Sequence, residues 1–221
     1  MKPKTLDHVA FWVADREPIV DFLTEHVGMH VIDRQDAFTL VGSDARRGKL
    51  TLFTAEGPRE RGAFKHVALR VTDLERATAG LPSAELELGE GVRVQLVEAQ
   101  TDVEYDLDHV ALVSADPEQT AQEYLELGFN SAAPSGEGHP RVEVGGAYVE
   151  FHRGDPGEPD KPLMNHVAVL VDEVDPVIAE AEKREIVDNV VDAANTRAVF
   201  VWGPERVRIE YVEHKPGFAL Q

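Results

Sequence analysis

The chain repeats one tetrapeptide pattern four times: Asp7-His8-Val9-Ala10, Lys65-His66-Val67-Ala68, Asp108-His109-Val110-Ala111 and Asn165-His166-Val167-Ala168. Each copy opens a run of alternating, mostly β-branched or aromatic residues, which is the pattern of a β-strand. Enough chain follows each copy for a helix and further strands. The sequence therefore predicts four modules built on a common plan.

The repeated histidine lies on one face of each predicted strand. Alternate side chains of a strand point to opposite faces, so His109 and Ala111 share one face while Val110 and Leu112 share the other. The Val face suits an apolar core and the His face suits an imidazole-lined cavity. A structural role, with each ring hydrogen-bonded to a neighbouring carbonyl, is the alternative, and the residues around each copy must decide between the two.

Composition excludes several classes of protein. The hydrophobic fraction of 43% is that of an ordinary globular chain. The 41 acidic and 22 basic residues give a formal charge of −19, which repels nucleic acid and anionic membranes, so neither is expected as a partner. The absence of cysteine excludes disulfides, thiolate metal ligands and cysteine nucleophiles.

No targeting segment is apparent in the sequence. Met1-Lys2-Pro3-Lys4 leads directly into the first predicted strand without an apolar signal core. No run approaches the roughly 18 apolar residues of a membrane-spanning helix. A cytoplasmic location is therefore expected.

The first module illustrates the common plan of strand, helix and three further strands. Asp15 can begin a helix that runs to about Val27, and Gly28 is placed to end it. Extended segments are predicted after it at residues 29–33, 37–42 and 49–55.

The other modules follow this plan to different degrees. Helices are predicted after Asp73, after Asp116-Pro117 and at 177–184. Strands are predicted at residues 92–97, 141–144, 147–152, 186–191, 198–202 and 207–212. The second module is compressed, with one short helix and one clear final strand. A polar segment, Ala99 to Asp106, lies near the midpoint and predicts a boundary between domains at residues 1–103 and 104–221.

Carboxylates recur at matching places in the final strands of the last two modules. The segment 207–210 aligns with 92–95, and 148–151 aligns with the segment that ends at Phe53. The C-terminal half therefore places four chemically active side chains at corresponding positions, namely His109, Glu150, His166 and Glu210. In the N-terminal half, Leu52 and Gln95 stand where the carboxylates would be.

This pattern resembles the vicinal oxygen chelate superfamily, which includes glyoxalases, extradiol dioxygenases, and bleomycin and fosfomycin resistance proteins. The resemblance covers nearly the whole chain, and the stretch Gly203 to Glu210 looks like the superfamily's terminal turn and ligand-bearing strand. It implies an α+β fold of four βαβββ modules. These modules would be paired two and two within the halves, each pair forming an incomplete barrel around a cavity.

The resemblance also implies a divalent metal held by His109, His166 and Glu210, with Glu150 as a fourth ligand. Two imidazoles and one carboxylate leave open positions on Fe(II) or Mn(II) for a bidentate oxygen ligand, whereas four ligands would be glyoxalase-like, with Ni or Zn. The N-terminal half, which lacks the carboxylates, is expected to bind no metal. Solvated edge-strand carboxylates are the alternative for both glutamates.

Other side chains are weaker candidates for roles in a functional site. Tyr148 and His152 flank Glu150 at two-residue spacing, so they are predicted to face the same cavity as catalytic groups for proton transfer, or else to be exposed strand residues. Phe200 and Trp202 either line an apolar substrate site or pack in the core. The remaining histidines have no paired context and are expected at the surface: His26, His30, His139 and His214.

Three functions remain open from the sequence. One is a metal-dependent, dioxygenase-like oxidoreductase acting on a small oxygenated or aromatic molecule that chelates the metal. The second is a glyoxalase-type lyase or isomerase, and the third is a metal-free drug-binding protein. Four modules favour the first, but residues 192–200 contain no histidine, and Phe200 stands where dioxygenases carry a tyrosine. Superfamily members that build a site from two modules often do so across a dimer, so a homodimer also remains open.

Overall fold

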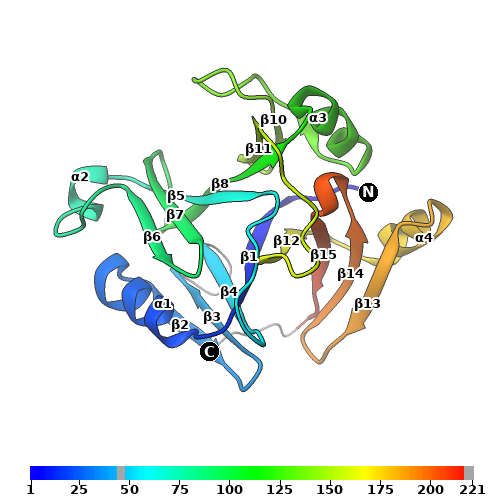
Figure 1. Cartoon of the computed structure of the whole chain (residues 1–221). Coiled ribbons are helices and arrows are strands. Elements are labelled where there is room, and N and C mark those ends of the chain that lie inside the picture. The colour runs from blue at the N-terminus through cyan, green and yellow to red at the C-terminus, as the bar shows by residue number, and fades with distance from the viewer. Residues whose placement is uncertain (44–47, 217–221) are drawn as a thin grey trace.

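The structure is a computed structural model that describes residues 1–43 and 48–216. Its strands form two mixed sheets, with the helices around their outer sides (Figure 1). The helices are α1 (Glu17–Phe22), the π-helical turn η1 (Leu23–Val27), α2 (Leu74–Ala77), α3 (Pro117–Glu126), α4 (Asp175–Lys183) and the 3₁₀ turn η2 (Pro204–Arg206). None of the helices in these residues is long and apolar enough to cross a membrane.

The eight-stranded sheet combines the first module with the fourth. In spatial order its strands are β13 (Val187–Asp192), β14 (Thr196–Trp202), β15 (Arg208–His214), β12 (Met164–Leu170), β1 (Thr5–Val13), β4 (Lys49–Thr54), β3 (Phe38–Gly42) and β2 (His30–Arg34). β1 and β12 are antiparallel neighbours at its centre.

The seven-stranded sheet combines the second module with the third. Its strands, in spatial order, are β6 (Glu85–Gly89), β7 (Val92–Glu98), β5 (Phe64–Val71), β8 (Asp106–Ser114), β11 (Ala147–Arg153), β10 (Arg141–Val144) and β9 (Asn130–Ser131). β5 and β8 form its central antiparallel pair.

The pairing of modules differs from the one expected from the sequence. Pairing within residues 1–103 and within 104–221 was predicted, but each sheet takes strands from both sides of that boundary, four and four in the larger sheet and three and four in the smaller. The reason is that four similar first strands carry no mark that selects one partner over another. The boundary between β7 and β8 therefore divides the chain without dividing the sheets.

Local structure follows the predicted elements more closely. The helix expected from Asp15 to about Val27 appears as α1 and η1, and Gly28 ends it with φ of 87° in the left-handed region. The Asp116 carboxylate accepts a hydrogen bond from the backbone N–H of Gln119 at 3.3 Å and caps α3. The short strand β6 was not predicted.

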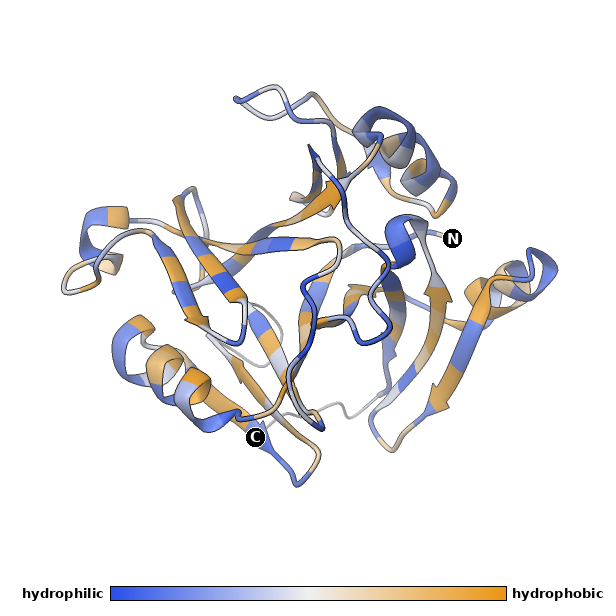
Figure 2. Ribbon diagram, viewed as in Figure 1, coloured by the Kyte–Doolittle hydropathy of each residue, from blue (hydrophilic) through white to orange (hydrophobic). Residues whose placement is uncertain are grey.

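One continuous core joins the two sheets. The valines of all four tetrapeptides are at most 2% exposed, and they lie on the opposite strand face from the histidines. Phe11 of β1 and Phe64 of β5 meet edge to face, with ring centroids 4.9 Å apart, so the core crosses between sheets. In Figure 2 apolar residues lie mainly along the strands, whereas α3 is largely hydrophilic.

The four tetrapeptides meet in pairs with the same register. In the eight-stranded sheet His8 lies opposite Ala168 and Ala10 lies opposite His166. The seven-stranded sheet repeats this arrangement with His66 opposite Ala111 and Ala68 opposite His109. Because the alanine opposite each histidine is small, the imidazole can extend over it toward the histidine of the paired strand.

We predict that Ala10→Leu destabilises the fold by about 1–3 kcal/mol, because Ala10 is fully buried opposite His166 and a larger side chain there overpacks the strand pair. Denaturant unfolding monitored by circular dichroism measures the effect. Ala37→Leu, at an exposed position before β3, is the control and should change stability by less than about 0.5 kcal/mol. Equal midpoints for Ala10→Leu and the unmodified chain would contradict this view of the register.

Candidate metal site

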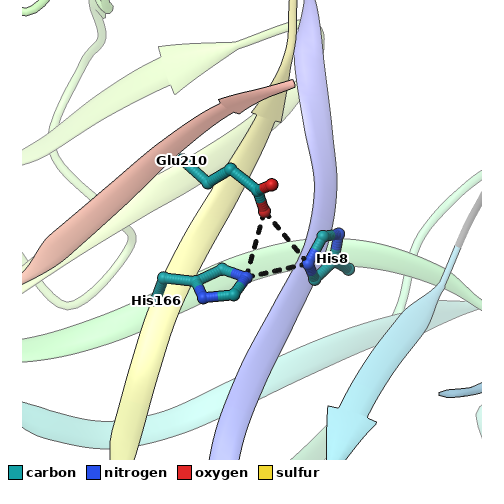
Figure 3. Close-up of side chains that lie close together, drawn as sticks. All are labelled: His8, His166 and Glu210. Carbon is teal, nitrogen blue, oxygen red and sulfur yellow. Dashed lines mark hydrogen bonds and ion pairs between the residues drawn. The ribbon is translucent and has the colours of Figure 1, made fainter. Parts of the chain in front are cut away.

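Three donor atoms converge on one face of the eight-stranded sheet. The Nε2 atoms of His8 and His166 are 2.9 Å apart. Glu210 Oε2 lies 3.3 Å from Nε2 of His8 and 3.1 Å from Nε2 of His166. Figure 3 shows the carboxylate pointing between the two rings, with the residues coming from the neighbouring strands β15, β12 and β1. We call these three residues the triad.

Strand register places the triad. β12 and β15 are parallel, with Ala168 beside Glu210, so His166 and Glu210 project from the same sheet face. The antiparallel pairing of β1 with β12 then brings His8 to the same point. Antiparallel and parallel pairs on either side of β12 are therefore both needed to assemble the triad.

In the triad, the residue that precedes each histidine fixes the orientation of its imidazole ring. Asp7 Oδ1 lies 3.0 Å from Nδ1 of His8, and Asn165 Oδ1 lies 3.0 Å from Nδ1 of His166. Both oxygens accept, so we assign the ring proton to Nδ1, which leaves the Nε2 lone pairs directed at the triad centre. Three acceptors then face one another, an arrangement that a cation satisfies and that neutral side chains do not. The donor set therefore fits a divalent metal.

Electrostatics favour the protonation states that bind metals. Burial lowers the pKa of the His166 imidazole, against an opposing effect of Glu210. Burial alone would raise the pKa of Glu210, but the interaction of its carboxylate with the His166 imidazole holds that pKa below its ordinary value. A neutral imidazole beside an ionised carboxylate is the state that a metal requires of its ligands.

A buried ion pair supports the triad from outside. Lys49 Nζ donates to both Asp7 carboxylate oxygens, at 2.8 and 2.9 Å, and both side chains are 3% exposed. His214 Nε2 lies 3.3 Å from Asp7 Oδ2. Burial would raise the pKa of Asp7, but its hydrogen bonds with His214 and His8 and the charge of Lys49 hold that pKa well below its usual range. Asp7 therefore stays ionised and fixed beneath His8.

The triad differs in one member from the group of side chains that was predicted to converge. The structure brings His166 and Glu210 together as expected, but the third member is His8 and not His109, which lies in the other sheet. His8 was also expected to lack an anionic partner, yet Glu210 lies beside it. Both differences follow from the pairing of the first module with the fourth.

Register also corrects the equivalent position in the first module. Ala10 pairs with Thr51, just as Ala168 pairs with Glu210. Leu52, the residue predicted to stand in the carboxylate position, instead points into the core and is fully buried. The alignment made from sequence was thus displaced by one residue, which moves a strand side chain to the opposite face.

The seven-stranded sheet holds a second, different cluster. Nε2 of His66 and Nε2 of His109 are 3.0 Å apart, as in the triad. Glu150, however, is turned toward His152, whose Nε2 lies 2.8 Å from Glu150 Oε1. Lys65 Nζ donates to Nδ1 of the same imidazole at 2.7 Å. His152 is therefore bracketed by a cation and an anion.

This second cluster lines a cavity of about 600 Å³. His139, expected at the surface, lies against His152 with ring centroids 3.9 Å apart and the rings tilted by 41°. Ligand atoms of His139, Glu150 and His152 lie within 4.8 Å of one another, so this group can also hold a cation. Burial, together with the nearby His109 and Lys65, lowers the pKa of His66 to about 3. His66 is therefore neutral over the ordinary pH range.

The remaining candidates divide between the two sheets. Tyr148 is in register with His109, but its ring lies beneath the Arg141 guanidinium, 4.0 Å away, and it is not among the residues that line the cavity. Phe200 is buried with its ring 5.2 Å from that of His166, whereas Trp202 is 47% exposed. His26 and His30 are exposed as expected, and His214 contacts Asp7.

Comparison with known families agrees with the resemblance stated from the sequence. Residues 5–102 match the model of a family described as Glyoxalase/Bleomycin resistance protein/Dioxygenase superfamily, which confirms the resemblance. A search of curated proteins finds no match.

Solved structures share the fold over almost the whole chain. A putative dioxygenase from Bacillus subtilis aligns with a TM-score of 0.74 and 15% identity, over 97% of this chain and 86% of its own. Glyoxalase I from Zea mays gives 0.72 and 15%, over 95% and 92%. The cppA protein from Streptococcus pneumoniae TIGR4 gives 0.61 and 12%, over 96% and 98%. The structural similarity establishes the fold of paired βαβββ modules. Because the sequence identities are low, it does not establish the activity, which is argued from the site.

We predict that Lys49→Met lowers the free energy of unfolding by about 3–5 kcal/mol, because it leaves the buried Asp7 carboxylate without its cation. Lys4→Met is the matched control, since Lys4 pairs with Asp172 at the surface, and its loss should cost less than about 1 kcal/mol. Chemical denaturation at neutral pH measures both. Similar values for the two variants would show that the buried pair adds nothing to stability.

Proposed function

We propose that this chain is a metal-dependent enzyme and that the triad is its metal site. Residues 5–102 match the superfamily model, and the fold is shared over nearly the whole chain. The proposed substrate is a small oxygenated or aromatic molecule that chelates the metal through two neighbouring oxygens. The observation that carries the proposal is the convergence of two imidazole nitrogens and one carboxylate oxygen within 3.3 Å of one another.

The number of ligands favours the dioxygenase-like alternative at this site. The fourth strand position is Thr51, a buried neutral hydroxyl, where a glyoxalase-like set would place another ligand. Two histidines and one carboxylate suit Fe(II) or Mn(II) and leave adjacent positions open. When bound, the metal would act as a Lewis acid toward a chelating substrate.

The chain's own residues would orient the substrate and exclude water. Phe200 and Phe53 place their rings 5.2 and 6.3 Å from the His166 ring, so the triad faces an aromatic environment. Asp7 and Asn165 hold the two imidazoles in one orientation. Phe200 cannot donate a proton, so the proposal covers substrate chelation and activation and does not extend to ring cleavage.

The seven-stranded sheet supports a second candidate function. Its four equivalent positions, His66, Gln95, His109 and Glu150, are all polar, and they line the 600 Å³ cavity. Glu150 stays ionised because its hydrogen bond with His152 and the electrostatic effect of the nearby His109 outweigh burial and hold its pKa below the usual value. A carboxylate linked through His152 to Lys65 is suited to hold and move a proton. This arrangement favours a glyoxalase-type lyase or isomerase with Ni or Zn.

Metal binding discriminates between these alternatives. We expect Glu210→Ala and His8→Ala to weaken Fe(II) or Mn(II) binding at the triad by more than about 10–100-fold, because direct ligands matter at least as much as their supports. Glu150→Ala and His109→Ala, at equivalent positions of the other sheet, are the matched controls and should retain that binding. Anaerobic loading with competition against a chelator measures affinity, and metal analysis gives stoichiometry. If Glu210→Ala kept its metal and activity, a metal-free binding protein would become the leading alternative.

The residue behind His166 provides an independent check. Asn165→Ala removes the acceptor of the His166 Nδ1–H and should weaken metal binding by about 10–100-fold. Asn165→Asp keeps an acceptor and should bind at least as well as the unmodified chain. The same chelator competition measures both, and equal weakening by the two variants would argue against the assigned ring orientation.

A further inference from the structure

A cavity of about 250 Å³ lies on the eight-stranded sheet beside the triad. Both tryptophans of the chain line it, Trp12 and Trp202, together with Arg59, Arg206 and Arg208. Asn165, which accepts from the Nδ1–H of His166, is also part of its lining. The cavity is therefore in contact with one of the two residues that orient the triad histidines.

The cavity and the triad share one face of the sheet. Arg208 precedes Glu210 by two residues on β15, so the two side chains point to the same side, roughly 7 Å apart along the strand. Phe200 bridges them, since its ring is 5.2 Å from that of His166 and 4.1 Å from the Arg208 guanidinium. A ligand in the cavity would therefore extend toward the metal site along Phe200.

Two of the three guanidinium groups lack a neutralising partner among residues 1–43 and 48–216. Arg208 donates to Asp188 through Nε at 2.7 Å and is paired. Arg59 Nε is buried without a hydrogen-bond partner, and its guanidinium lies 5.2 Å from the centre of the Trp12 ring. Arg206 makes no ion pair in this part of the chain, although Asp160 also lines the cavity. In a chain of charge −19, two uncompensated guanidiniums at one cavity indicate an anionic ligand.

The turn that carries Arg206 is held in an unusual conformation. Glu205 and Arg206 both have φ of 55°, which is unfavourable for residues with a side chain. The Glu205 carboxylate accepts from the backbone N–H of Ala115 at 3.2 Å and from the Thr120 hydroxyl at 3.3 Å, which anchors the turn. Conformations of this kind persist where surrounding contacts enforce them, and they are concentrated at ligand sites.

The tryptophans give the cavity an aromatic character. Trp202 is 47% exposed, and its indole N–H donates to Asp188 Oδ1 at 3.0 Å, which fixes the ring at the cavity. Trp12 lies beneath the Arg59 guanidinium. A planar ring that bears an anionic group would use both kinds of lining, because the ring can lie against the indoles while a guanidinium binds the anion.

We propose that this cavity binds the carboxylate end of an aromatic carboxylate, with Arg59 and Arg206 holding the carboxylate and Trp12 and Trp202 contacting the ring. This inference rests on the proposed function and narrows its substrate class to aromatic acids that also carry metal-chelating oxygens. Arg208, which also lines the cavity, lies roughly 7 Å from Glu210 along β15, so an aromatic acid held in the cavity can extend toward the triad.

Intrinsic fluorescence tests the subsite without any turnover, because both tryptophans of the chain line it. Titration of the metal-free full chain with benzoate should give a saturable change, and neutral benzyl alcohol should bind at least tenfold more weakly. Arg59→Gln and Arg206→Gln together should weaken benzoate binding at least tenfold and leave benzyl alcohol unaffected. Arg93→Gln, which alters a guanidinium paired with Glu87 at the other cavity, is the matched control.

Equal affinities for benzoate and benzyl alcohol would overturn the proposal, as would a double variant that binds benzoate normally. Binding of phenyl phosphate at least tenfold more tightly than benzoate would overturn the assignment to a carboxylate. Glu210→Ala should bind benzoate normally, so loss of the metal site and loss of this subsite are distinguishable. In the metal-loaded chain, 3,4-dihydroxybenzoate should bind at least tenfold more tightly than benzoate, and Glu210→Ala should remove that gain.

Discussion

The whole arrangement depends on one cross-strand contact, a histidine opposite an alanine in a central antiparallel pair. The contact occurs twice in each sheet and involves all four tetrapeptides. Because the alanine methyl occupies little space, two imidazoles can approach within 2.9 or 3.0 Å through Nε2. The intervening valine points the other way and joins the common core. A single short pattern therefore supplies the centre of each sheet, the packing between sheets and two histidines for a site.

The two sites diverge through the residues that surround this shared contact. Asp7, Asp108 and Asn165 each place a carbonyl or carboxylate oxygen against Nδ1 of the following histidine. Lys65 has no acceptor and contacts His152 instead, so His66 lacks this support. Glu210 consequently faces two oriented imidazoles, whereas Glu150 is drawn away toward His152. Similar backbones thus carry a three-ligand metal set on one side and a polar cavity with a proton-holding pair on the other.

Sequence patterns located the helices and strands well but did not show which strands pair with one another. Alternation and caps located most of the helices and strands, because these signals are local. The choice of His109 over His8 as the partner of His166 was wrong, because both stand in the same tetrapeptide and only long-range pairing distinguishes them. The difference between Thr51 and Leu52 was lost in a one-residue misalignment, which periodicity alone cannot detect in a strand buried on both faces. Arg59 and Arg206 were not singled out, since isolated arginines in turns carry no sequence signal until the cavity beside them is known.

The pairing of the first module with the fourth also sets the order in which the molecule can form. His66 and His109 are 43 residues apart in the sequence, so the seven-stranded sheet closes its centre over a short loop. His8 and His166 are separated by 158 residues, and β1 has no central neighbour until β12 has been synthesised. Contacts between distant segments form slowly because the entropy of closing a long loop must be met first. The seven-stranded sheet is therefore expected to act as the template for folding. The edge of β1 that faces away from β4 stays unpaired and prone to aggregation until the last module arrives.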